Sequence, residues 1–278
     1  MSLPLYFALG KSFLENYKNF TFLYLKLLKD QNVDGETIQF VEELTNNLRE
    51  IIIDYLNGKV ASSYSKFKQE MKPVIEKLHK KTIPVKTFYR MRAEGGLSDI
   101  KEFHHIPFDK IYLSQNERFS IVGYPCLYLG YSKRVCEIEV SKGSLARFSL
   151  KKPLDKILDL TLGQGDGEKD ITEKDLVKIY PLIASCYIVP FYSTILEKEC
   201  TPEKSYFHEE YIIPQLLTLY LKEEGVADGI IYYSVKDPNL NPRGQGEKDF
   251  RNIVLFTKRE KLNENYDFEL IKKFEISL

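Results

Sequence analysis

The sequence has no excess of charge of either sign. Its 278 residues include 40 Lys and Arg side chains and 40 Asp and Glu side chains, so the formal net charge at pH 7 is zero. Without a positive field, neither nucleic acid nor an anionic membrane surface attracts the chain as a whole, and no nucleic-acid-reading motif is present. We therefore expect no direct nucleic-acid binding and no membrane association.

The chain also has little of what export requires. The segment MSLPLYFALGK lacks a basic stretch followed by an apolar run, and Lys26 interrupts the most apolar stretch, residues 20–28. Cysteine is scarce, and the four cysteines form no CxxC pair and no zinc-ligand spacing: they are Cys126, Cys136, Cys186 and Cys200. This pattern predicts reduced thiols and a cytoplasmic protein.

Histidine is scarce as well, with four in the chain. There is no GxSxG motif and no Cys-His constellation, so nothing supports a hydrolase triad. His104 and His105 are adjacent, and neighbours on a strand point to opposite faces; without a third ligand we expect no metal site. The glycine-rich segment at 163–167 lacks the Lys-Ser/Thr pair of a phosphate-binding loop and is interpreted as a turn.

Apolar content is ample, with 43% hydrophobic and 13% aromatic residues and no low-complexity tract, which predicts a globular chain. Between residues 11 and 81 the apolar residues recur at helical spacing, which predicts about three amphipathic helices. Asp34 is expected to cap one of them and Asn57-Gly58 to end it. These helices are interpreted as a packed cap or as the contact layer of a homo-oligomer.

From Pro84 onward, short β-rich runs alternate with turn residues: VKTFYRMR, KIYLS, PCLYLGY, CEIEV, ARFSL, CYIVPF, GIIYYSV and NIVLF. Helices are expected near residues 173–183 and 207–224. The sequence therefore predicts an α+β protein, with a helical N-terminal region at 1–83 and a mixed β-sheet domain at 84–278. The turn-rich segment at 236–250 is expected to be a long loop that borders a site or a surface excursion.

Arginine beside the β-runs is the first chemical signal. Arg90, Arg92 and Arg118 carry planar guanidinium groups that are suited to phosphate oxygens, although each also fits a surface ion pair. In CEIEV, interpreted as a strand, alternation places Glu137 and Glu139 on one face, which would be the solvent face in an ordinary protein.

Five stretches in order resemble the RES domain family, named for its Arg, Glu and Ser. They are FYRMR with Arg90, RFSIVGYPCLYLGYS with Arg118 and Tyr128, CEIEV with Glu139, ADGIIYYS with Ser234, and RNIVLF with Asn252. The resemblance covers residues 84–257 and leaves the helical region outside. Arg92 lies on the same strand face as Arg90 and competes with it, and Glu137 competes with Glu139, whose spacing from Tyr128 suits the family better.

The resemblance implies a fold similar to that of ADP-ribosyltransferases and an enzyme that degrades NAD as its substrate. Family members are toxins that cleave the nicotinamide-ribose bond by phosphorolysis, with inorganic phosphate, or by hydrolysis. Their partner is a separately encoded antitoxin with a DNA-binding domain. The alternatives are an ADP-ribosyltransferase that modifies a protein, and a non-catalytic module that binds a partner.

These residues suit that chemistry. Glu139 is expected to stabilise the cationic transition state at ribose C1′, with Arg118 and Arg90 as further catalytic groups and Arg92 beside them on the phosphates. Tyr128 offers a flat face to nicotinamide or ribose, and Ser234 and Asn252 offer hydrogen bonds to the carboxamide or the phosphates. Nicotinamide leaves as a neutral molecule, so neither a catalytic His nor a metal is required.

Overall fold

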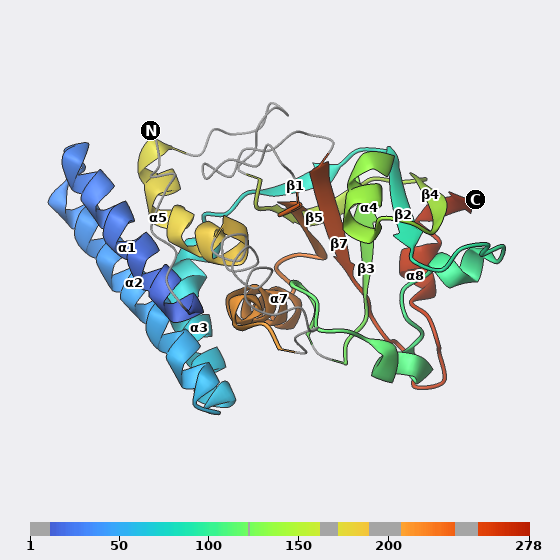
Figure 1. The fold of residues 1–278 in the computed structure, drawn as a ribbon, viewed down its shortest axis with the longest axis horizontal. Helices are drawn as coiled ribbons and strands as arrows, with labels where there is room; N and C mark the ends of the chain where they lie inside the picture. The colour runs from blue at the N-terminus through green and yellow to red at the C-terminus, as the bar shows by residue number, and fades with distance from the viewer. Residues whose placement is uncertain (1–11, 122, 162–171, 189–206, 237–249) are drawn as a thin grey trace. The chain divides into compact units, whose positions relative to one another are not determined.

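The computed structural model describes residues 12–121, 123–161, 172–188, 207–236 and 250–278 (Figure 1). The chain divides into two compact units. Unit 1 comprises residues 1–79, 163–220 and 241–245, and unit 2 comprises residues 80–162, 221–240 and 246–278. The expected division at residues 83 and 84 stays a prediction; by contacts, residues 163–220 group with the N-terminal helices. The glycine-rich segment 163–167, residues 237–249 and Cys200 lie outside the described residues.

Unit 1 is helical. Its described elements are α1 (Phe13–Asp30), α2 (Gly35–Leu56), α3 (Val60–Ile75), α5 (Glu173–Ile183), the π-helical turn η3 (Ala184–Ile188), the 3-10 turn η4 (Glu209–Tyr211) and α7 (Ile212–Glu223) as far as Tyr220. The three N-terminal helices are confirmed, and so are the expected ends of α2. Asp34 accepts the backbone N–H of Thr37 at 2.9 Å, and Asn57 is the C-cap that follows Leu56, before Gly58 turns the chain at φ +78°.

Aromatic side chains join α1 to α5 within unit 1. The rings of Tyr24 and Tyr180 lie 5.0 Å apart, and Phe20 stacks on Tyr24 at 5.9 Å. The Tyr24 hydroxyl donates to the carbonyl of Val177 at 2.9 Å, so this buried phenol keeps a partner, and burial raises its pKa. This packing explains the spacing of apolar residues in the N-terminal segment.

Unit 2 is built on one sheet. Its strands are β1 (Lys80–Ile83), β2 (Thr87–Arg92), β3 (Cys126–Gly130), β4 (Ser144–Leu150), β5 (Leu154–Asp159), β6 (Gly229–Tyr233), β7 (Arg251–Phe256) and β8 (Phe274–Ser277). The described strands follow the order β1-β5-β6-β7-β3-β2-β4-β8. The pair β5 and β6 is parallel and the other pairs are antiparallel, so the sheet is mixed. The expected α+β class, helices first and a mixed sheet after, is confirmed.

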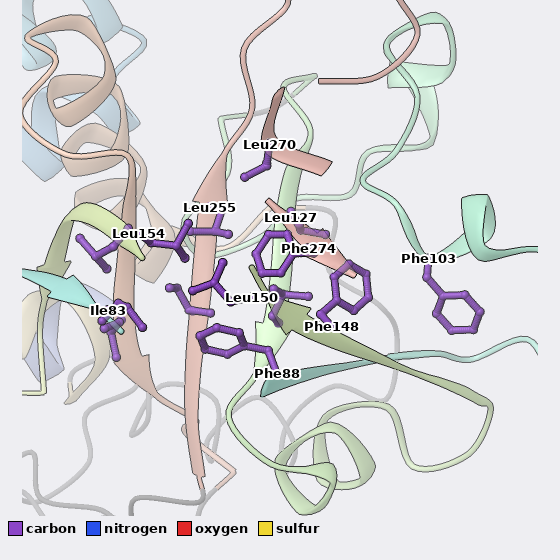
Figure 2. Packing of buried hydrophobic residues seen from close by; sticks show 14 of the residues in the cluster. Ile83, Phe88, Phe103, Leu127, Phe148, Leu150, Leu154, Leu255, Leu270 and Phe274 are labelled. Atoms are coloured by element: carbon purple, nitrogen blue, oxygen red, sulfur yellow. The ribbon is translucent and has the colours of Figure 1, made fainter. Parts of the chain in front are cut away.

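The two faces of this sheet carry different helices. On one face lies the main apolar cluster, to which Phe88, Phe148 and Leu255 belong together with Leu270 of α8 (Phe268–Ile271) and Phe103 of the 3-10 turn η1 (Ile100–Phe103) (Figure 2). Successive strand residues point to opposite faces of a sheet. The strand residues next to those of the cluster, such as Tyr89, Met91 and Leu145, therefore lie on the other face, where they pack with α4 (Lys133–Val140). We call this second side of the sheet the α4 face.

Several β-runs were assigned correctly and others were not. VKTFYRMR, PCLYLGY, ARFSL, GIIYYSV and NIVLF overlap β2, β3, β4, β6 and β7, whereas β1, β5 and β8 were not expected. KIYLS lies in the 3-10 segment η2 (Phe108–Leu113), and CYIVPF begins in the π-helical turn η3. His104 and His105 lie in bends rather than on a strand. In each case a short apolar run fits a turn of helix as well as a strand, because periodicity is not defined over so few residues.

None of the helices in the described ranges combines the length and the apolarity that a membrane crossing requires. Cys126, Cys136 and Cys186 are buried free thiols.

Candidate functional site

Helix α4 replaces the strand that CEIEV was expected to form. Ser132 caps it by accepting the backbone N–H of Val135 at 3.1 Å, which starts a helix directly after β3. The helix packs on the backbone of Gly130: a Cβ built there would lie 2.6 Å from Cγ1 of Val135 and 2.7 Å from Sγ of Cys136. Only glycine permits this approach, so Gly130 sets how closely α4 lies against the sheet.

Because the segment is helical, Glu137 and Glu139 do not share a face; two residues turn the helix by about 200°. Glu137 is exposed, whereas Glu139 is partly buried against the strands. Its Oε1 accepts the hydroxyl of Ser234 at 2.6 Å and Nδ2 of Asn252 at 3.2 Å. The side chain is therefore fixed through one oxygen, and Oε2 receives neither of these hydrogen bonds.

The strands explain why Ser234 and Asn252 meet at this point. Tyr232 of β6 pairs with Asn252 of β7, and Asn252 pairs with Gly130 of β3, so three strands place these positions side by side. Ser234 is fully buried and follows Tyr232 by two residues, which puts both on the α4 face.

Lys236 completes the surroundings of Glu139. Its backbone N–H donates to Oγ of Ser234 at 3.1 Å, and its Nζ donates to the main-chain carbonyl of Glu139 at 2.8 Å. The same Nζ lies 3.5 Å from Oε2 of Glu139. The carbonyl is one of the last of α4, which the helix itself leaves without a donor.

Tyr128 lies on the α4 face of β3, two residues from Gly130. Its hydroxyl is hydrogen-bonded to Oγ of Ser120 at 2.7 Å, and burial raises its pKa well above the usual value. The residue as a whole is partly exposed. The hydroxyl thus has a hydrogen-bond partner, and the residue keeps some exposed surface.

Arg118 is 9% exposed and lies near Tyr232, with Cζ 5.6 Å from the ring centroid. Phe119 contacts the same ring at 4.7 Å. Nε and Nη1 of Arg118 are buried and have no hydrogen-bond partner within the described parts of the chain. A buried guanidinium with unpaired N–H groups carries a desolvation cost that an anionic ligand would offset.

The two arginines of β2 have different hydrogen-bond partners. Arg90 is buried and its Nη1 points to the carbonyl of Tyr128 at 3.4 Å, whereas Arg92 donates to the carbonyls of Glu102 and His104, each at 3.0 Å. Burial lowers the pKa of both guanidinium groups, most for Arg90. Arg92 therefore anchors η1 and the residue after it.

Cys136 of α4 is a buried thiol on the same helix as Glu139. Burial raises the pKa of this thiol to about 11, and the charges of Glu139 and Arg90 act on it in opposite directions, the carboxylate raising the pKa and the guanidinium lowering it. A thiol protonated at neutral pH is a packing group here and not a nucleophile.

The structure thus joins Glu139 directly to Ser234 and Asn252, and places Tyr128 and the Arg118–Tyr232 pair on the same face. Arg90 and Arg92 alternate with Tyr89 and Met91, which pack with α4, so both arginines belong to the opposite face of the sheet, where Arg92 bonds to main-chain carbonyls. Sequence reasoning missed Gly130, Ser120, Tyr232 and Lys236; of these, only Lys236 had a signal, two residues after the expected Ser. Among the residues with described positions, no three His, Cys, Asp or Glu side chains gather as metal ligands would.

One curated protein similar to this chain is Putative toxin YopC of Bacillus subtilis (strain 168), which is 32% identical over 252 residues. The match covers 81% of this chain and 56% of the relative, so the chain spans little more than half of that protein. No model of a known protein family matches the chain, and no solved structure does. The likeness to a toxin is a finding, while membership of the RES family and the ADP-ribosyltransferase-like fold stay predictions.

Proposed function

We propose that this protein degrades NAD by cleaving the bond between ribose C1′ and nicotinamide, with phosphate or water as the acceptor. The observation that carries this proposal is the Glu139 carboxylate, held through Oε1 by Ser234 and Asn252 on a sheet face that also bears Tyr128. Arg118 lies near Tyr232 of this face, and its Nε and Nη1 have no hydrogen-bond partner among the described residues. A carboxylate fixed in this way is suited to stabilise a developing cation.

The chemistry needs little beyond that carboxylate. As the C1′–N bond lengthens, positive charge moves from the pyridinium ring to C1′ and the oxygen of the ribose ring. A fixed anion lowers the energy of that state. Two donors on Oε1 prevent the side chain of Glu139 from rotating, so reorganisation during the reaction is small. Nicotinamide leaves as a neutral base and requires no proton from an acid.

On this proposal, the pyrophosphate of NAD supplies the hydrogen-bond partner that Nε and Nη1 of Arg118 do not find among the described residues. Its Nε and Nη1 are already desolvated, so binding an anion there removes an unsatisfied charge instead of desolvating a new one. Tyr128, which is partly exposed as a residue, belongs to the same face, and its ring is the group proposed to stack on nicotinamide or ribose. In this proposal, Ser234 and Asn252 contribute by holding Glu139 and do not bind the carboxamide of NAD directly.

A toxin would act by depleting NAD in the cell that makes it, and the similarity to a protein described as a toxin supports this role. The cell that makes such an enzyme must inhibit its activity. The RES resemblance implies that the inhibitor is a separately encoded antitoxin with a DNA-binding domain. Co-purification of the protein with the product of the neighbouring gene would test that partner.

The experiment that tests the activity is incubation of the purified protein with NAD labelled in the adenylate part, with and without phosphate. We expect release of nicotinamide with labelled ADP-ribose, or labelled ADP-ribose 1″-phosphate when phosphate is present. Label on protein instead would establish a transferase. NAD left intact, with no binding detected by calorimetry, would leave a non-catalytic partner-binding module.

A further inference from the structure

Lys236 brings a second charge to the Glu139 carboxylate. Its Nζ hydrogen-bonds to the Glu139 main-chain carbonyl at 2.8 Å and lies 3.5 Å from Oε2, the oxygen that Ser234 and Asn252 leave open. The side chain is 44% exposed, so the ammonium is not enclosed by protein. An ammonium has three N–H donors, and the only hydrogen bond that Nζ makes with a described residue is the one to this carbonyl.

The position of the Lys236 side chain does not depend on its contact with Oε2 of Glu139. Its shortest contact is the carbonyl at the C-terminal end of α4, where the helix leaves negative partial charge. Its own backbone N–H bonds to Ser234, which fixes the base of the side chain. The ammonium can therefore keep its place beside Oε2 when a substrate approaches that oxygen.

An anion beside Glu139 would otherwise be repelled. Phosphate and a carboxylate a few ångströms apart both carry negative charge, and a cation between them removes the repulsion while donating hydrogen bonds. On the proposed function, C1′ reacts next to Oε2, so a group held by Lys236 lies within reach of that carbon.

From this we infer that Lys236 binds an anionic acceptor, inorganic phosphate, and makes the enzyme a phosphorylase in preference to a hydrolase; this rests on the proposed function. A phosphate oxygen forms a bond to C1′ as the C1′–N bond breaks. The electron pair of the broken bond goes to the ring nitrogen, which becomes neutral nicotinamide. The proton of hydrogen phosphate stays on the new monoester or passes to solvent.

The test measures how the products divide between phosphate and water. Full-length wild type, Lys236→Met, Lys236→Arg and the control Lys272→Met are incubated with NAD over a phosphate series, and nicotinamide, ADP-ribose and ADP-ribose 1″-phosphate are separated by chromatography. Lys272 is a matched control because its Nζ also pairs with a carboxylate, Glu269, at 2.9 Å on the surface. Circular dichroism and thermal unfolding check that each variant is folded.

We expect Lys236→Met to lower the ratio of phosphorolysis to hydrolysis about tenfold or more, the scale of a charge-assisted contact. Lys236→Arg and Lys272→Met should keep the wild-type ratio. An unchanged ratio in Lys236→Met, or an equal fall of both products, would overturn the inference and leave NAD cleavage standing; an equal fall would mean that Lys236 only positions Glu139. Wild type that releases only ADP-ribose would also overturn it, and wild type that releases no nicotinamide would overturn the proposed function as well.

Discussion

Replacing Gly130 by Ala adds a methyl group where α4 touches β3. The new Cβ would lie 2.6 Å from Cγ1 of Val135 and 2.7 Å from Sγ of Cys136. Carbon atoms in contact are normally about 3.5–4.0 Å apart, so the helix must move away by roughly 1 Å. Val135 is fully buried and Cys136 nearly so, which leaves no room for their side chains to turn aside.

This movement is expected to affect stability and activity together. Overpacking a buried contact costs about 1–3 kcal/mol in the free energy of unfolding. Glu139 moves with α4, and its hydrogen bond from Asn252, already 3.2 Å long, would be stretched beyond hydrogen-bonding distance. A displacement of roughly 1 Å at a catalytic group can reduce the rate about a hundredfold.

Two assays separate the effects: urea unfolding followed by circular dichroism, and nicotinamide release under conditions where the variant is fully folded. Gly95→Ala is the control, because nothing lies within 4 Å of a Cβ built there. We expect the control to match wild type in both assays. The reasoning would be refuted if Gly130→Ala were as stable and as active as Gly95→Ala.

Further predictions concern charge. Arg118→Met should weaken NAD binding about tenfold or more without lowering the unfolding midpoint, because two buried N–H groups without a partner among the described residues cost the folded state more than the guanidinium contributes. Arg92→Met should instead lower the free energy of unfolding by about 2–3 kcal/mol, because two carbonyls lose their donor. The free energy of unfolding should also decrease as the pH is lowered, because of His105. Burial lowers the pKa of His105 to about 4 and keeps the ring neutral; Nδ1 then donates to the carbonyl of Ile106, and Nε2 accepts the backbone N–H of Asp267. The unfolded chain takes up this proton from about pH 6.5, so roughly 3 kcal/mol is lost between pH 6.5 and pH 4.

Calorimetric titration with NAD and thermal unfolding test the arginines. A lower unfolding midpoint for Arg118→Met with unchanged NAD affinity would show that this guanidinium is structural. For His105, urea unfolding at pH 7, 5.5 and 4 is compared between wild type and His105→Gln. The variant should be less stable at pH 7 but should lose less stability on acidification, and identical pH slopes would contradict the assignment.

The helical half of the fold could be predicted because its pattern is long. The residues of α2 cover 22 positions with Asp34 before them and Asn57 after them, so periodicity and capping agree. Helix α4 has eight residues, and CEIEV alternates as well as any strand. The decisive features for α4 were the Ser132 cap and the absence of a side chain at Gly130, and neither is a feature of periodicity.

The site could be predicted in part for a different reason. The choice of Glu139 over Glu137 came from spacing in the RES resemblance, and the helix gives it a physical basis by turning the two side chains apart. Sequence could not show that Ser234 and Asn252 serve Glu139, because the three residues come from three elements separated by up to 113 positions. Ser120 was missed because it is defined by a contact and not by a pattern, and for Lys236 the position two residues after Ser234 was the only signal.

The most direct test of the central claim is nicotinamide release from NAD by wild type, Glu139→Gln and Glu137→Gln, measured side by side. The two variants remove the same charge from the same helix, but only Glu139 is fixed by Ser234 and Asn252. We expect Glu137→Gln to keep the wild-type rate and Glu139→Gln to lose about a hundredfold or more, the scale of a lost transition-state charge contact. Equal rates for all three proteins, or no nicotinamide released by wild type, would contradict the account.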